Sequence, residues 1–214
     1  MNSYYKFLFF VLFVSCSIFT IAQENLNIDY SIIKENMEKD SITYIRLKSR
    51  YERNDSTLTY PEYAILYYGY SFTPQYAIKE DADKKELERL IDNQKYQDAY
   101  LLGRKILQRN PVALYALYNM YYLSQTLNRS PQEINSYIIK YSGILHTIAL
   151  SGDGKSESTA FRVITTDDMY QLAYNYWGVN EITLQYQVGI YEVIEFTQSQ
   201  HYKENRMYFE IANQ

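Results

Sequence analysis

The polar loop at residues 151–161 divides the chain, because the pattern of hydrophobic residues differs on its two sides. Before the loop, apolar residues recur every three or four positions, which is typical of amphipathic helices. After it, apolar and polar residues alternate, most clearly from Ile182 to Val188, which is typical of a half-buried strand. The sequence therefore predicts an α+β protein, helix-rich to about residue 150 and followed by a small antiparallel sheet.

The size and charge of the chain limit its organisation and its partners. With 214 residues and 47% hydrophobic content, it is long enough to bury a core. We expect a single α+β domain over residues 23–214, with a helical part at 28–150, a loop at 151–160 and a sheet-containing part at 161–214. The formal net charge is −4, and the sequence has no basic block interleaved with aromatic residues. Nucleic acid is therefore not an expected partner.

The N-terminus predicts export. Lys6 precedes an unbroken apolar run at residues 7–14, and small residues follow it up to Ala22. This pattern is typical of a secretory signal peptide, here residues 1–22, and the mature protein is expected to be periplasmic, secreted or envelope-associated. The run is shorter than the roughly 20 residues that span a bilayer, so no transmembrane segment is expected in the mature protein. The alternative is a lipoprotein anchored through Cys16, the single cysteine.

The helical part has recognisable helix signals. Helices are predicted at residues 28–39, 42–53, 80–93, 112–127 and 134–150, and Thr59 and Glu62 form a capping box that opens another. The apolar spacing predicts these inward-facing residues for the first two helices: Ile28, Ile32, Ile33, Met37, Ile42, Ile45 and Leu47. A further set, Tyr96, Ala99, Leu107 and Pro111, resembles the spacing of a tetratricopeptide-type hairpin over about residues 94–142, which implies a helical scaffold.

Tyrosine is the most unusual feature of the composition, with 26 residues in the chain. Its ring is apolar and its hydroxyl is polar, so exposed tyrosines suit wet grooves that hold sugars or peptides. The alternative is that these side chains pack in the core. Two groups are candidate ligand-binding residues, one at a helix end and one forming a stripe along residues 112–127: Tyr67, Tyr70 and Tyr76, and Tyr115, Tyr118 and Tyr122.

The loop itself has a Gly-Lys-Ser sequence that fits a relaxed phosphate-loop pattern. That motif needs a preceding strand and a following helix, whereas a helix is predicted before this loop, so no nucleotide is expected. A structural turn is the preferred interpretation. In it, Gly152 and Gly154 supply positive φ angles, while Asp153, Ser156 and Thr159 bind local amides.

Metal and cofactor chemistry has little support in the sequence. His146 and His201 are the only histidines, they lie far apart, and neither belongs to a paired metal-binding motif. Removal of the signal peptide would also remove the only thiol. We therefore expect no metal and no cofactor.

Acidic residues are the remaining candidates for catalysis. Two carboxylates drawn from Asp153, Glu157, Asp167 and Asp168 would be needed for hydrolysis of a glycosidic bond, although acidic residues near a loop are usually solvated. The leading interpretation is a non-enzymatic exported binding or accessory module that recognises a protein, peptide or glycan in the cell envelope. The alternative is an envelope hydrolase that uses acidic residues of the 153–168 region.

Three motifs together resemble a known family, the domain of unknown function 4919. They are LYYGYSFTPQY at residues 66–76, SGDGKSESTAFRVI at 151–164 and YFEI at 208–211. The resemblance implies an exported protein of Bacteroidetes-type bacteria, with one helical-plus-sheet domain that spans both halves of the chain. Members of that family often have an apolar residue where Lys155 stands, which argues further against a nucleotide site. The resemblance carries no activity, substrate or catalytic residue.

Overall fold

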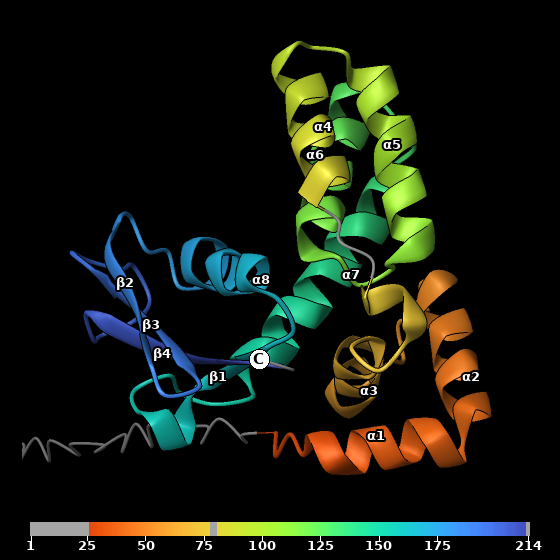
Figure 1. Cartoon of the computed structure of the whole chain (residues 1–214). Coiled ribbons are helices and arrows are strands. Elements are labelled where there is room, and N and C mark those ends of the chain that lie inside the picture. Colours follow the sequence, from red (N-terminus) through yellow and green to blue (C-terminus); the bar gives the residue numbers. More distant parts are fainter. Residues whose placement is uncertain (1–25, 78–80, 213–214) are drawn as a thin grey trace, which may run out of the picture.

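The computed structural model describes residues 26–77 and 81–212, so the predicted signal peptide at residues 1–22 lies outside the described residues. An upright helical arm and a sheet meet in an L-shaped arrangement (Figure 1). The helices before the loop are α1 (Tyr30–Lys39), α2 (Ser41–Glu52), α3 (Tyr60–Tyr70), the short 3-10 helix η1 (Pro74–Ala77), α4 (Asp81–Asp92), α5 (Tyr96–Arg109), α6 (Leu114–Thr126) and α7 (Pro131–Ala149). The α+β class and the helix-rich first part are confirmed.

The first three helices begin where side chains satisfy their free backbone amides. The Asp29 carboxylate accepts hydrogen bonds from the N–H groups of Ser31 and Ile32 at the start of α1. At the start of α3, the Thr59 N–H donates to the Glu62 carboxylate at 2.8 Å, so the predicted capping box is confirmed. Such caps stabilise a helix terminus by about 1 kcal/mol.

The inward faces of α1 and α2 differ from the prediction. Ile33 is buried, but Ile32 is exposed, and on α2 Ile42 and Ile45 are 76% and 64% exposed. Leu47 is buried as predicted, and Tyr44 and Tyr51 complete the core face of α2 in place of the two isoleucines. These rings pack against the tyrosine-rich helix α3; Tyr51 meets Tyr63 edge-on at 6.0 Å. Tyrosine rings bury a large surface and meet one another edge-on, and the Tyr51 hydroxyl also reaches the Pro111 carbonyl, so this face of α2 turns inward.

The upright arm consists of α4, α5, α6 and α7, each packed against the next (Figure 1). Leu87, Ile106, Met120 and Leu123 are fully buried between α4, α5 and α6. Gly103 on α5 allows close approach, since an added Cβ would lie only 2.4 Å from the Met120 sulfur. The helical scaffold implied by the repeat resemblance is therefore present.

The chain after the loop forms a four-stranded sheet. Its elements are the short 3-10 helix η2 (Glu157–Thr159), β1 (Phe161–Val163), α8 (Thr166–Gln171), a π-helical turn η3 (Leu172–Tyr176), β2 (Ile182–Val188), β3 (Tyr191–Phe196) and β4 (Arg206–Ile211). The strand order is β1-β4-β3-β2. The β2–β3 and β3–β4 pairs are antiparallel, but β1 and β4 run parallel, so the sheet is mixed and the all-antiparallel prediction needs this correction.

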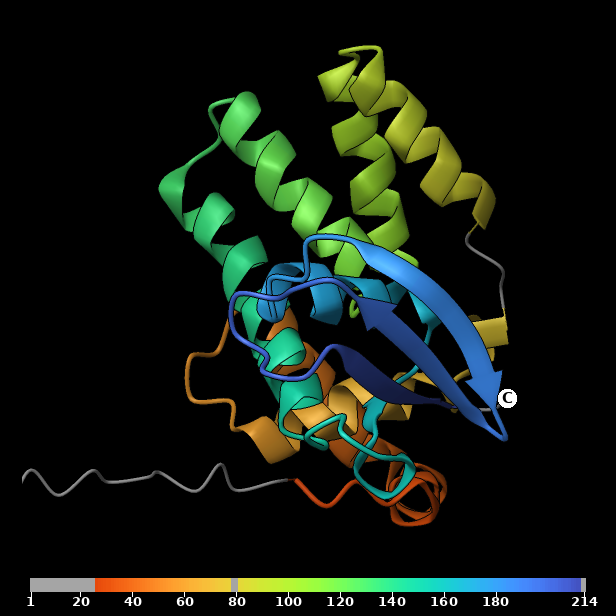
Figure 2. The same cartoon turned by 90° about the vertical axis from the view of Figure 1, so that its left-hand side faces the viewer.

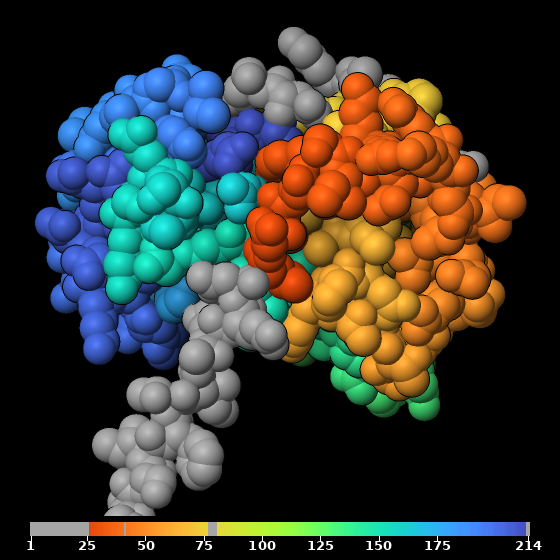
Figure 3. Space-filling model, turned by 90° about the horizontal axis from the view of Figure 1, so that it is seen from below, coloured from red at the N-terminus to blue at the C-terminus, as the bar shows by residue number. Residues whose placement is uncertain are grey.

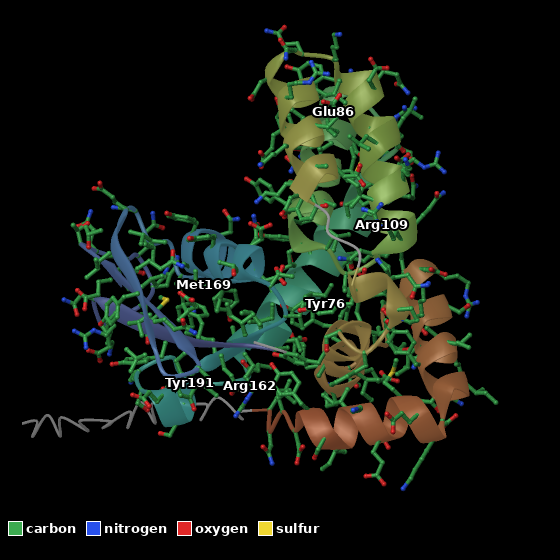
Figure 4. All side chains as sticks on the ribbon, viewed as in Figure 1. Tyr76, Glu86, Arg109, Arg162, Met169 and Tyr191 are labelled. Carbon is green, nitrogen blue, oxygen red and sulfur yellow. The ribbon has the colours of Figure 1, made fainter. Side chains whose placement is uncertain are left out.

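The parallel pair follows from the chain path. After β1 the chain leaves through α8 and η3, makes the β2–β3 hairpin and returns beside β1 as β4. Helix α8 lies along one face of the sheet, and its Met169 points toward the strands (Figure 4). Figure 2 shows the sheet in front of α7 and α8. The fully buried Phe161, Ile194 and Phe209 belong to the core cluster that joins sheet and helices.

The loop at residues 151–160 is a structural turn, as predicted, but of its two glycines only Gly154 has a positive φ, of 66°. The expected positive φ at Gly152 is wrong; this glycine is required for space beside the Thr159 and Ala160 carbonyls. The Asp153 and Gly154 N–H groups both donate to the Thr159 carbonyl, at 3.0 and 2.8 Å, and the Gly154 carbonyl accepts from the Tyr208 N–H of β4 at 2.9 Å. The Ser156 and Thr159 hydroxyls are hydrogen-bonded to each other at 2.9 Å. These amides are therefore not free to bind a phosphate. Figure 3 shows the loop beside the start of α1 on the same face of the molecule.

Candidate functional site

The first group of predicted tyrosines is buried. Tyr67 is fully buried, so its assignment to a stacking surface is wrong. Tyr70 is 4% exposed and only borders a surface hollow, so its ring offers no open stacking face. Tyr76 is half-buried, and its hydroxyl donates to the Ile164 carbonyl at 2.6 Å (Figure 4). These tyrosines are buried because α3 lies where the helical part of the chain meets the sheet. Its hydroxyl-bearing rings hold β1 in place; the Tyr68 hydroxyl donates to the Arg162 carbonyl at 2.9 Å.

Tyr67 belongs to a buried polar group. Its hydroxyl donates to the Asp168 carboxylate at 2.8 Å and accepts from the Ile164 N–H at 3.0 Å. Asp168 is 4% exposed, and burial raises the pKa of this carboxyl to about 7, although hydrogen bonds from Tyr67 and Thr165 favour the charged form. Asp168 is thus enclosed by the protein, which makes it a structural group at the start of α8.

The second group of predicted tyrosines is split between the core and the surface. Tyr115 is buried, whereas Tyr118 and Tyr122 are each 42% exposed. Tyr118 packs against the Tyr141 ring at 5.5 Å, and Tyr122 meets Tyr96 at 6.4 Å. The described residues therefore do not bring the six predicted tyrosines into one surface, because α3 and α6 belong to different layers.

The acidic residues considered for hydrolysis have different partners. Asp153 lies 3.9 Å from Lys155, and Asp167 is paired with Lys84. Asp168 is buried with Tyr67, and Glu157 is exposed on η2. Within residues 26–77 and 81–212, no three His, Cys, Asp or Glu side chains are grouped to hold a metal ion.

The surface also contains an extended groove between α2 and α5. It consists of two adjoining hollows, of about 390 and 310 Å³, that share Gln108 and Pro111. We call it the α2–α5 groove. The larger hollow is lined by Tyr51, Glu52, Arg104, Leu107, Gln108, Pro111, Leu117, Tyr137 and Lys140. The smaller one is lined by Tyr44, Lys48, Tyr70, Thr73, Gln75, Gln108, Arg109 and Pro111.

One face of α2 forms a continuous wall of the groove. Tyr44, Lys48 and Tyr51 are spaced by four and three residues, which places them on the same side of a helix. Tyr51 is fixed there because its hydroxyl donates to the Pro111 carbonyl at 3.0 Å. The buried rings of Tyr44 and Tyr51 thus give the wall a rigid apolar base, with Lys48 between them.

Lys140 of α7 supplies a half-buried positive charge. Its ammonium lies 5.2 Å from the centre of the Tyr51 ring and donates to the Glu52 carbonyl at 3.3 Å. Burial lowers the pKa of Lys140, and the nearby Glu52 carboxylate opposes part of that shift. An ammonium group with reduced access to water binds an anion more strongly than a fully hydrated one, because less solvation is lost on contact.

The α5 side of the groove is also basic. Arg109, at the lower end of α5 in Figure 4, borders the smaller hollow and pairs with Asp83 at 2.8 Å. Arg104 borders the larger hollow and is exposed. The lining therefore contains four cationic side chains and one carboxylate, Glu52, with Asp83 neutralising one of the cations from outside. An excess of positive charge remains in the groove.

The sequence analysis did not identify this groove. Its only predicted member is Tyr70, which borders the smaller hollow with little exposed surface. The Tyr-x-x-x-Lys-x-x-Tyr spacing on α2 was the available signal. The apolar spacing of Ile42 and Ile45 masks this signal, because it predicts a different face of α2 as the inward one.

Comparisons with known proteins identify the family. A family model described as domain of unknown function (DUF4919) matches residues 31–214. No curated protein and no solved structure matches the chain. Among the residues with a described structure, no helix is both long and apolar enough to span a membrane.

Proposed function

Since the chain belongs to the DUF4919 family, a domain of unknown function, we propose a role for it from the α2–α5 groove. It acts as a non-enzymatic binding module of the cell envelope that holds an extended acidic peptide segment. The observation that carries this proposal is the adjacency of two hollows that share Gln108 and Pro111 and combine tyrosine side chains with an excess of cations.

The charges of the groove favour an acidic ligand. The groove is bordered by three cations that have no buried ion pair: Lys48, Arg104 and Lys140. The ammonium of Lys48 lies 3.9 Å from the carboxylate of Glu52, and both side chains are substantially exposed. Such an exposed ion pair contributes little, so Glu52 is easily displaced by a ligand carboxylate. Complementary charge increases the association rate and selects against basic partners.

The length of the groove favours an extended chain. Tyr44 and Tyr51 are seven residues apart on α2, which corresponds to about 10 Å along a helix axis. An extended peptide covers this distance in about three residues. The two hollows therefore suit two side chains of one extended segment, with an apolar group against the half-buried Leu107 and Tyr137 and carboxylates against the cations.

The envelope location is part of the proposal and rests on the signal-peptide pattern at residues 1–22. We expect mass spectrometry of the protein isolated from its native cells to find a free or cyclised Gln23 at the N-terminus. A lipidated Cys16 would instead support the lipoprotein alternative, and an intact Met1 would contradict export.

Binding of acidic peptides is tested with charge reversal in the groove. A fluorescent peptide of alternating Glu and Tyr is expected to bind the wild type, and binding should weaken as salt increases. The double substitution Lys48→Glu and Arg104→Glu is expected to reduce affinity at least about tenfold, equivalent to 1.4 kcal/mol. Fluorescence anisotropy measures both dissociation constants.

The matched control is Arg46→Glu with Lys105→Glu. These residues lie on the same two helices, are exposed and border neither hollow, while the change in net charge is identical. The control should retain wild-type affinity. Equal losses in both double variants, or equal binding of a Lys–Tyr peptide, would contradict recognition in the groove.

A further inference from the structure

Strand β2 is an unprotected sheet edge. Among the described strands it pairs with β3 alone, and it lies on the outer side of the sheet toward the viewer in Figure 2. Leu184 and Val188 are 51% and 37% exposed. Protein edge strands are usually protected by lysine, proline, a bulge or a covering element, because their free backbone groups pair with other strands.

The usual protection is missing from most of β2. Residues 182–188 include no charged residue and no proline. The register against β3 shifts between Ile182 and Leu184, and from Leu184 to Val188 the pairing is regular. The bulge therefore leaves a regular, neutral edge of five residues.

This edge is complementary to itself. In an antiparallel pair of two β2 strands with Tyr186 on the two-fold axis, Leu184 of each copy lies opposite Val188 of the other, and Gln185 lies opposite Gln187. Paired residues share a face of the sheet. The apolar side chains thus meet apolar side chains, the amides meet amides, and like charges are not brought together.

We propose that β2 is a homodimerisation edge, at which two copies of this chain pair their β2 strands about a two-fold axis at Tyr186 and join their four-stranded sheets. Backbone hydrogen bonds between the two edges supply the affinity, as in other cases of strand addition. The contact is isologous, so it closes after two copies. It lies on β2 and is separate from the α2–α5 groove.

Light scattering coupled to size-exclusion chromatography tests the dimer. The wild-type mass should rise from one chain toward two as concentration increases, and Leu184→Lys should return it to one chain. The exposed control Gln125→Lys on α6 should behave as the wild type. A monomer at every concentration, or a dimer that Leu184→Lys leaves intact, would overturn the proposal.

The pairing register is tested by cross-linking in a Cys16→Ser background. Residues directly opposite in an antiparallel pair have Cα atoms about 4.5 to 5.5 Å apart, a distance that a disulfide bridges. Tyr186→Cys should therefore form a covalent dimer on mild oxidation, while the exposed control Thr197→Cys should remain largely monomeric. Equal cross-linking at both positions would contradict a two-fold axis at Tyr186.

Discussion

The substitution Gly152→Ala is expected to destabilise the protein by about 3 kcal/mol or more, because the new Cβ would overlap rigid backbone. That atom would lie 2.4 Å from the Thr159 carbonyl oxygen and 2.6 Å from the Ala160 carbonyl oxygen. Backbone oxygens fixed in the turn have no alternative rotamer. The change would therefore open the loop that joins α7 to β1, and urea denaturation measures the loss of unfolding free energy.

Two other glycines distinguish the cost of a left-handed backbone conformation from the cost of a steric clash. Gly189 has a φ of 61° with no neighbour within 4 Å of an added Cβ, so Gly189→Ala should cost only about 1 kcal/mol for the left-handed conformation. Gly154 has a φ of 66°, and its Cβ would lie 2.3 Å from the Phe161 ring, so both costs apply. A Gly152→Ala variant no less stable than Gly189→Ala would contradict the tight loop geometry.

The second large effect concerns Asp168. Burial raises its pKa to about 7 from an ordinary value of 3.8, so the folded state holds this proton more tightly than the unfolded state does. The stabilising contribution is complete below pH 3.8 and is lost as pH rises toward 7. At pH 8, Asp168→Asn should therefore be more stable than the wild type by up to about 4 kcal/mol. The asparagine carbonyl still accepts from Tyr67.

Chemical denaturation of both proteins from pH 4 to pH 8 measures this effect. The stability difference between wild type and Asp168→Asn should be small at pH 4, grow between pH 4 and pH 7, and then stay constant. Glu157→Gln is the control, since Glu157 is exposed on η2 and its substitution removes one carboxyl in the same way; it should leave the stability nearly unchanged. A difference between wild type and Asp168→Asn that does not change with pH would show that Asp168 is not a buried carboxyl with a raised pKa.

Much of the fold follows from local sequence signals. The Thr59–Glu62 capping box, the loop at 151–160 and the alternation at Ile182–Val188 act within a few residues, and each predicted element is present. The parallel pairing of β1 and β4 is different, since it joins Phe161 to Phe209 across the whole C-terminal part of the chain. Periodicity in one strand carries no information on the direction of its partner.

The site was less predictable because tyrosine suits both the core and the surface. Tyr67 and Tyr118 have the same side chain, yet Tyr67 on α3 is fully buried against Ile164 and Asp168, while Tyr118 is 42% exposed on α6. The difference depends on which layers pack together. In α2 the more apolar side chain, Ile42, is exposed, and the more polar one, Tyr51, is buried. Tyr51 can be buried because its hydroxyl donates to the Pro111 carbonyl. The groove depends on this arrangement.

The location of peptide binding is tested most directly by photo-cross-linking. A Glu–Tyr peptide with a photoreactive residue at its centre would be irradiated with the purified protein, and the linked residues would be mapped by mass spectrometry. The α2–α5 groove predicts links within residues 44–52 and at Gln108 or Pro111, and their loss in the Lys48→Glu, Arg104→Glu variant. Links concentrated on α6 around Tyr118 and Tyr122, or on the β2 edge, would contradict binding in the groove.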